Sequence, residues 1–339
     1  MTKKWKKAIA LSLAALTLTG ALAGCGDDKK AVSGAAKPAA GQTIKINFPT
    51  AGASGALYAV GAAITNMWSS QVPGVQASSQ ASAGGIANLN MVSEGEAQVS
   101  IAISSNVYQC LNGTDSFKDH AYKDLKAIGG LYLNPNQVVA TANSGINSLK
   151  DVKGKHFAVA SAGSSVYNEC ETHFTAAGLS FPDDIKAEYI TFTDAADMLQ
   201  NGSIDGAWIM SGAPASAVTQ ALQALTGGAH LVEIDDNLIK ELKAKYPWYT
   251  SYTIKAGTYP NQDKDVKTSA IKMVMFCRGD LPEDVVYQLT KTLWEHMDEL
   301  GQSQKNLKGL TAENAVKDIA DIPLHPGAAK YYKEIGVLK

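Results

Sequence analysis

Turns rich in glycine and serine are the segments of this sequence best suited to binding chemistry. Four of them lie between a short apolar segment and a helical pattern, at residues 50–55, 82–85, 161–165 and 211–214. Main-chain N–H groups at a helix start have no partner in the helix and carry partial positive charge. Glycine lets a ligand approach the backbone, and serine adds a hydroxyl group without bulk. Any single turn of this kind could be an ordinary cap, but their recurrence in both halves favours an anion-binding crevice.

Side chains that could support catalysis or metal binding form no complete motif. The segment Gly52-Ala53-Ser54-Gly55-Ala56 lacks the last glycine of a nucleophile elbow, and no P-loop precedes Gly154-Lys155. None of the six histidines forms a pair at metal-ligand spacing. We therefore expect no metal, no cofactor and no enzymatic activity. The alternative is an extracytoplasmic α/β hydrolase with Ser54 or Ser164 as nucleophile, which would need a histidine base from elsewhere in the chain.

Composition and charge restrict the class of protein. The chain is 45% apolar and 18% charged, a composition typical of a globular protein. Its length of 339 residues is too great for a single hydrophobic core. Thirty Lys and Arg against 32 Asp and Glu give a net charge of −2, so no nucleic-acid partner is expected. Arg278 is the only arginine, which leaves one position for a guanidinium clamp on a carboxylate.

The N-terminal segment has the pattern of a secretory signal. Lysines 3, 4, 6 and 7 precede an apolar run that is too short to span a membrane, and Leu22-Ala23-Gly24-Cys25 resembles a bacterial lipobox. We expect residues 1–24 to be a lipoprotein signal peptide, Cys25 to carry the lipid, and residues 25–42 to be a flexible tether. This places the protein outside the cytoplasm, anchored to a bilayer. The alternative is an ordinary free cysteine near a signal cleavage site.

The other three cysteines, Cys110, Cys170 and Cys277, have apolar neighbours. Buried free thiols are the favoured interpretation, and one disulfide stays open as the alternative.

The elements that must position these turns recur along the chain. A short apolar strand, a Gly/Ser turn and an amphipathic helix follow one another in both halves. This order predicts an α/β fold of two lobes with parallel sheets covered on both faces. We assign residues 43–138 and 253–339 to lobe 1 and residues 139–252 to lobe 2. A hinge strand is expected at residues 137–141, and a return crossing near residues 252–258.

The sequence carries a set of short segments in a characteristic order. The closing one is residues 322–334 (Ile-Pro-Leu-His-Pro-Gly-Ala-Ala-Lys-Tyr-Tyr-Lys-Glu). The others are residues 55–61 with Tyr58, Gly84 to Leu89, Gly145 to Lys155, Ala162 to Ser165, Asn201 to Ala207, Ser211 to Pro214, Tyr246-Pro247 and Ala256 to Tyr259. By these segments the sequence from about Thr43 to Lys339 resembles a TAXI-type solute receptor of the tripartite ATP-independent periplasmic (TRAP) transporters, and the closing segment is the most family-specific piece.

The resemblance implies a type II periplasmic-binding-protein fold, with two lobes that close by hinge motion on a small anionic solute. It implies a glutamate- or 2-oxoglutarate-like carboxylate, delivered to a membrane permease with fused subunits that uses an ion gradient. A receptor that presents its ligand to a sensor kinase is the other alternative. The sequence departs from the family pattern at three pocket turns, where it has Leu57-Tyr58-Ala59, Gly84-Gly85 and Gly163-Ser164-Ser165. The implied ligand contacts are Ser54, Tyr58, Gly85, Asn88, Ser104, Gly163, Ser164, Ser165, Ser211 and Gly212.

Overall fold

The computed structural model describes residues 43–52, 56–223 and 228–339. The predicted signal peptide, tether and lipidation site at Cys25 lie outside these residues, as does Ser54. No helix within the described ranges is long and apolar enough to cross a bilayer.

The first group of elements alternates strands and helices. It comprises β1 (Ile44–Pro49), α1 (Ala56–Gln71), β2 (Val75–Gln80), α2 (Gly85–Ser93), β3 (Val99–Ile103), α3 (Ser104–Asn112), the 3₁₀ turn η1 (Asp115–Phe117) and β4 (Leu125–Thr141). After β10 (Val266–Arg278) the chain adds α8 (Glu283–Glu295), α9 (Met297–Ser303), η3 (Lys305–Leu307), α10 (Ala312–Ala315) and α11 (Pro326–Glu334) to this group.

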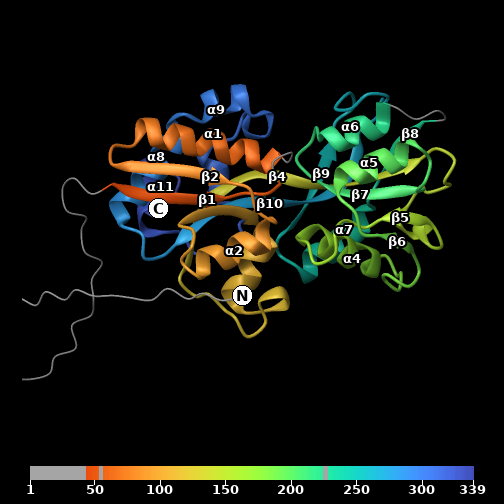
Figure 1. Cartoon of the computed structure of the whole chain (residues 1–339), viewed down its shortest axis with the longest axis horizontal. Helices are drawn as coiled ribbons and strands as arrows, with labels where there is room; N and C mark the ends of the chain where they lie inside the picture. Colours follow the sequence, from red (N-terminus) through yellow and green to blue (C-terminus); the bar gives the residue numbers. More distant parts are fainter. Residues whose placement is uncertain (1–42, 53–55, 224–227) are drawn as a thin grey trace, which may run out of the picture. The chain divides into compact units, whose positions relative to one another are not determined.

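The second group lies between β4 and β10 in the sequence. It comprises η2 (Leu149–Val152), β5 (His156–Ala158), α4 (Ser165–Ala176), β6 (Lys186–Glu188), α5 (Phe192–Gln200), β7 (Gly206–Met210), α6 (Ser216–Gln223), β8 (Ala229–Val232), α7 (Asp236–Lys245) and β9 (Tyr249–Ile254). Figure 1 shows β4 and β10 running from the first group into the second.

The long strands β4 and β10 join the two groups through their pairing. The first part of β4 pairs with β10, and its last residues pair with β7 and β8. Strand β10 pairs with β9 at its start and with β3 at its end. The structure thus confirms an α/β fold in two lobes. The predicted hinge strand, residues 137–141, is the end of β4, which continues without a break past the predicted lobe limit at residues 138/139. That limit and the one at residues 252/253 stay predictions.

Two predictions about the sheet need correction. The main sheet, in the order β3-β10-β4-β7-β5-β6, is mixed, because β4 and β10 are antiparallel to their partners. Among the strands of the described residues, only the pairs β1–β2, β5–β6 and β5–β7 are parallel. The return crossing is β10 itself. Residues 252–258 end β9 and begin the turn of an antiparallel hairpin with β10.

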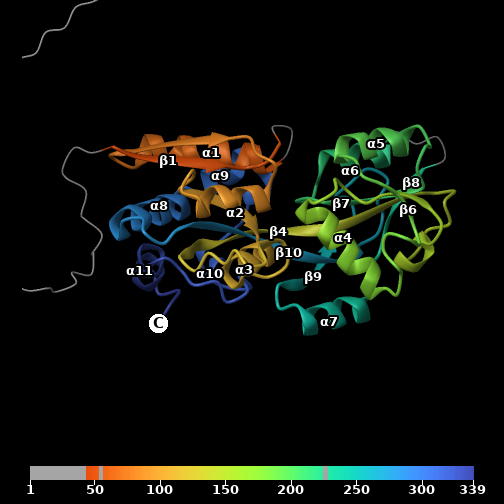
Figure 2. The ribbon, with the colours of Figure 1, turned by 60° about the horizontal axis from the view of Figure 1, so that its bottom comes forward.

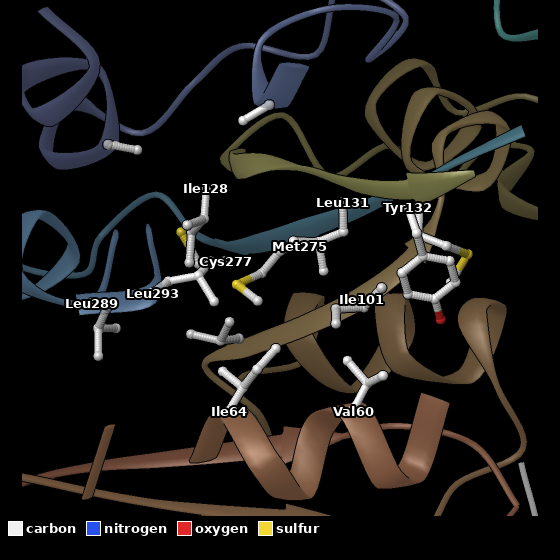
Figure 3. Packing of buried hydrophobic residues seen from close by; sticks show 14 of the residues in the cluster. Val60, Ile64, Ile101, Ile128, Leu131, Tyr132, Met275, Cys277, Leu289 and Leu293 are labelled. Atoms are coloured by element: carbon white, nitrogen blue, oxygen red, sulfur yellow. The ribbon is translucent and has the colours of Figure 1, made fainter. Parts of the chain in front are cut away.

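The alternating side chains of β10 supply two separate cores in lobe 1. Met275 and Cys277 point to the core under α1 and α8, whereas Val274 and Phe276 pack against α2 and α3. Figure 3 shows the first of these cores, in which Val60 and Ile64 of α1 face Ile101, Met275 and Leu293.

Lobe 2 repeats this arrangement on β7. Trp208 faces the core beside α4, and Ala207 and Ile209 face the core beside α5 and α6.

The three cysteines of the folded body lie in different cores. Cys110, Cys170 and Cys277 are buried and free, as the favoured interpretation predicts. Burial raises the pKa of the Cys110 thiol to about 11, so it stays protonated and unreactive.

Candidate functional site

The predicted Gly/Ser turns of the two lobes meet at a cavity of about 250 Å³. Lobe 1 contributes the start of α2 and the end of β3, and lobe 2 contributes the start of α4 and the end of β7. The lining residues are Ala51, Ala56, Leu57, Ala83, Gly84, Gly85, Ala102, Ile103, Tyr132, Asn134, Ser164, Ser165, Val166, Phe192, Met210, Ser211, Gly212 and Met273.

On the lobe 1 side, the backbone at the start of α2 forms the wall. Gly84 precedes the helix with φ +99°, a conformation that side chains other than glycine rarely adopt. Gly85 packs so closely that an added Cβ atom would lie 3.2 Å from the Cβ atom of Ala102. These two glycines therefore keep the main chain of the first turn open to the cavity.

On the lobe 2 side, two serines at the start of α4 face the cavity. The Ser164 hydroxyl caps the helix by accepting a hydrogen bond from the Tyr167 N–H group at 3.1 Å. The Ser165 hydroxyl donates to the Asn106 side chain on α3 at 2.5 Å, which ties the two lobes together. Neither α2 nor α4 has an acidic residue in its first turn, so no carboxylate of these turns offsets their partial positive charge.

The end of β7 completes this side. Gly212 lies against the Asn306 side chain from lobe 1, where an added Cβ atom would come within 2.7 Å. The Ser211 carbonyl accepts a hydrogen bond from the Gln137 side chain of β4 at 2.8 Å. The cavity is therefore closed by contacts that cross from one lobe to the other.

Five of the ten predicted contact residues line this cavity: Gly85, Ser164, Ser165, Ser211 and Gly212.

The other described residues of that set lie elsewhere. Asn88 uses its amide to hold the Thr50 and Ile101 carbonyls and the Ser82 hydroxyl. Gly163, with φ +72°, shapes the turn before α4.

Tyr58 is half-buried on α1 next to the lining residue Leu57, but it is not itself a lining residue. The Ser104 hydroxyl is buried at the start of α3, with no hydrogen-bond partner among the described residues.

Two polar side chains of the lining, those of Tyr132 and Asn134, are not among the predicted contacts. Tyr132 and Asn134 stand two positions apart on β4, so their side chains project from the same face of the strand. The only local signal for them is the alternation of an extended segment, which does not distinguish a lining residue from a core residue.

The cavity contains no Lys, Arg, His, Asp or Glu among the described residues that line it. Arg278 is at the end of β10, where its guanidinium pairs with the Asp280 carboxylate through Nε–Oδ1 at 2.9 Å and Nη2–Oδ2 at 2.5 Å. Within the described ranges, no cluster of three or more His, Cys, Asp or Glu residues could hold a metal ion. Binding here must therefore depend on hydroxyl groups, amides and main-chain N–H groups.

A second cavity of about 810 Å³ lies on the flank where α3, α4 and α7 approach one another (Figure 2). Glu169 lies in its wall, with its carboxylate accepting from the Tyr249 hydroxyl at 2.5 Å and the Ser105 hydroxyl at 3.3 Å. Burial raises the pKa of Glu169 to about 7. This cavity contains none of the predicted contact residues.

One protein family matches nearly the whole chain after the N-terminal segment. The model of the NMT1-like family matches residues 48–336.

Several solved structures are similar at low identity. The alkanesulfonate-binding protein from Xanthomonas axonopodis pv. citri, bound to MOPS, is 16% identical, with 87% of this chain and 85% of that chain covered and a TM-score of 0.49. The aliphatic sulphonate-binding protein from Escherichia coli is 18% identical, with 86% and 78% covered and a TM-score of 0.46. A putative L-cystine ABC transporter from Listeria monocytogenes is 14% identical, with 81% and 98% covered and a TM-score of 0.47.

Proposed function

The chain belongs to the NMT1-like family, and we propose that it is an extracytoplasmic solute-binding receptor that delivers its solute to a membrane permease. The observation that carries this proposal is the cavity of about 250 Å³ built from the turns of both lobes. A cavity between two bodies joined by two strands suits capture by hinge closure. We propose that the bodies that move are residues 43–138 with the segment after β10, and the residues that lie between β4 and β10.

The proposal also specifies the type of transporter, the class of solute and the membrane anchor. The sequence resemblance supports a TAXI-type receptor that serves a TRAP permease with fused subunits. It also supports a small carboxylate as solute, with glutamate and 2-oxoglutarate as the first compounds to test. The lipobox-like Leu22-Ala23-Gly24-Cys25 supports a lipid anchor on Cys25.

A hydrolase is the weaker interpretation. Ser164 already serves as the cap of α4, and no His, Asp or Glu among the described lining residues could act as its base. His173, the histidine on the same helix, is buried with both ring nitrogens hydrogen-bonded elsewhere. These contacts favour binding over catalysis.

Thermal unfolding of the purified protein with a panel of small organic acids and amino acids tests the receptor function. A solute at 100 times its dissociation constant should stabilise the protein by about 2.7 kcal/mol. The Ser164→Ala variant should need more solute for the same stabilisation, whereas Ser93→Ala, at the half-buried last residue of α2 and outside the cavity lining, should behave as the unmodified protein. A panel that leaves the unfolding temperature unchanged at millimolar concentration would contradict the proposal.

A further inference from the structure

The polar groups of the cavity are few and uncharged. Beyond the serines and main-chain amides of the turns, they are the Tyr132 hydroxyl and the Asn134 amide on β4. The tyrosine also stays neutral, because burial raises the pKa of its hydroxyl. A solute in this cavity therefore meets no charged side chain from the lining residues.

Tyr132 and Asn134 are nonetheless placed to contact a solute. Their residues are 7% and 9% exposed, and neither side chain has a hydrogen-bond partner among the described residues. Figure 3 shows the Tyr132 ring extending away from β4 with its hydroxyl at the free end. Neither the Tyr132 hydroxyl nor the Asn134 amide is among the fully buried polar atoms that lack a partner, so both groups are open to the cavity, where a solute can hydrogen-bond them.

The rest of the cavity wall is apolar. Its larger members are Leu57, Ile103, Val166, Phe192, Met210 and Met273, which come from both lobes. One anionic group can be held at the first turns of α2 and α4, whose N–H groups carry partial positive charge. A second anionic group would have to be buried without a partner against this wall, which is strongly unfavourable.

We propose that the cavity selects an organic acid with one anionic group and an apolar body, and that Tyr132 and Asn134 hydrogen-bond polar atoms of this solute. The inference rests on the proposed receptor function and narrows its solute class, because it disfavours glutamate and 2-oxoglutarate, the dicarboxylates that the sequence resemblance implies. The cavity of about 250 Å³ restricts the body to a short chain. Size and charge together define the solute class.

Pairs of acids with the same carbon chain provide the test. Pentanoate against glutarate, 2-oxopentanoate against 2-oxoglutarate, and norvaline against glutamate each differ by one carboxylate. Calorimetry with the full-length protein in non-ionic detergent should show the singly carboxylated member of a pair binding at least about tenfold more tightly. If the dicarboxylate binds equally or more tightly, the inference is wrong and the receptor function stands. If no acid of any pair binds, both are overturned.

Conservative variants test the two side chains. Tyr132→Phe removes one hydroxyl group and should weaken binding of the preferred acid by about threefold to tenfold. Asn134→Leu keeps the size of the side chain and should weaken it by at least as much. Tyr252→Phe on β9 and the exposed Asn237→Leu on α7 are the matched controls, and their affinities should not change. Unchanged affinity in both Tyr132→Phe and Asn134→Leu would overturn the assignment of these residues.

Discussion

The Nδ1 atom of His173 lies 2.7 Å from the main-chain oxygen of Glu169, one turn earlier on α4, and both side chains are buried. Because Nδ1 donates to that carbonyl, Nε2 is free to accept from the Ser269 hydroxyl at 2.7 Å, which fixes a neutral imidazole. The Ser269 oxygen also accepts from the Asn136 amide at 3.0 Å. The Glu169–His173 pair is thus connected to both long strands that join the lobes, through Asn136 on β4 and Ser269 on β10.

Burial shifts the two groups in opposite directions. It raises the pKa of Glu169 to about 7 and lowers the pKa of His173 to about 4. Between about pH 4.5 and pH 6.5, folding makes Glu169 take up a proton and makes His173 release one. The two contributions to the pH dependence of the unfolding free energy therefore oppose each other in this window.

We predict that two single variants show separately how Glu169 and His173 make the unfolding free energy depend on pH. With Glu169→Gln, His173 titrates alone, so stability should rise between about pH 4 and pH 6.5 by up to about 3 kcal/mol. With His173→Gln, Glu169 titrates alone, so stability should fall between about pH 4.5 and pH 7 by a similar amount, about 3 kcal/mol.

Urea unfolding of both variants and the unmodified protein from pH 4 to pH 8 measures these slopes. The comparison uses the shape of each curve, because either substitution also lowers stability at every pH. Parallel curves for all three proteins would show that folding does not shift the pKa values of Glu169 and His173 in this way.

A second prediction concerns the contact between the lobes at Gly212. An added Cβ atom would come within 2.7 Å of the Asn306 side chain, so Gly212→Ala should hold the lobes apart at this point. A strain of about 1 kcal/mol would weaken solute binding by roughly fivefold. Shortening the opposing side chain in the Gly212→Ala, Asn306→Ala double variant should restore most of the affinity. A double variant that binds no better than Gly212→Ala would place the effect elsewhere.

The third prediction concerns the membrane anchor. The lysine-rich start, the apolar run and Leu22-Ala23-Gly24-Cys25 predict that Cys25 carries lipid. Cys25→Ser should move the protein from the membrane to the soluble fraction after cell fractionation. Cys110→Ser serves as the control, because that thiol is buried in the folded body and should not affect partition. Equal membrane association of Cys25→Ser and the unmodified protein would contradict lipidation.

The local part of the site was predictable from sequence, and the long-range part was not. The turn at residues 161–165 indicates a helix start, and α4 begins at Ser165. Pairing of β10 with β4 joins residues more than 130 positions apart, such as Ala270 and Pro135, and no local pattern encodes it. This explains why the parallel sheet and the crossing at residues 252–258 were wrong.

The same limit applies to individual side chains of the turns. Asn88 and Ser164 both stand near a helix start, where sequence alone does not distinguish a ligand contact from a structural hydrogen bond. In the structure the Asn88 amide is fully used by neighbouring carbonyls and a hydroxyl, whereas Ser164 lines the cavity while it caps α4. Tyr132 and Asn134 lie in a strand that only the folded sheet brings beside the turns.

The last prediction separates capping from solute binding. The Ser164 hydroxyl oxygen accepts from the Tyr167 N–H group, which leaves its own proton free to be donated to an anion in the cavity. Ser164→Ala should therefore lower stability by about 1 kcal/mol through the lost cap. It should also weaken solute binding by about 10- to 150-fold if the hydroxyl bonds the charged group.

Two matched variants complete this experiment. Thr191 caps α5 in the same way, by accepting from the Asp194 N–H group, but it does not line the cavity. Thr191→Ala should therefore cost the same stability, about 1 kcal/mol, and leave affinity unchanged. Arg278→Ala should leave affinity within about threefold, because its guanidinium is held by Asp280 outside the cavity. Calorimetry on the three variants decides the matter: loss of binding in Arg278→Ala, with Ser164→Ala neutral, would mean that an arginine clamp holds the solute.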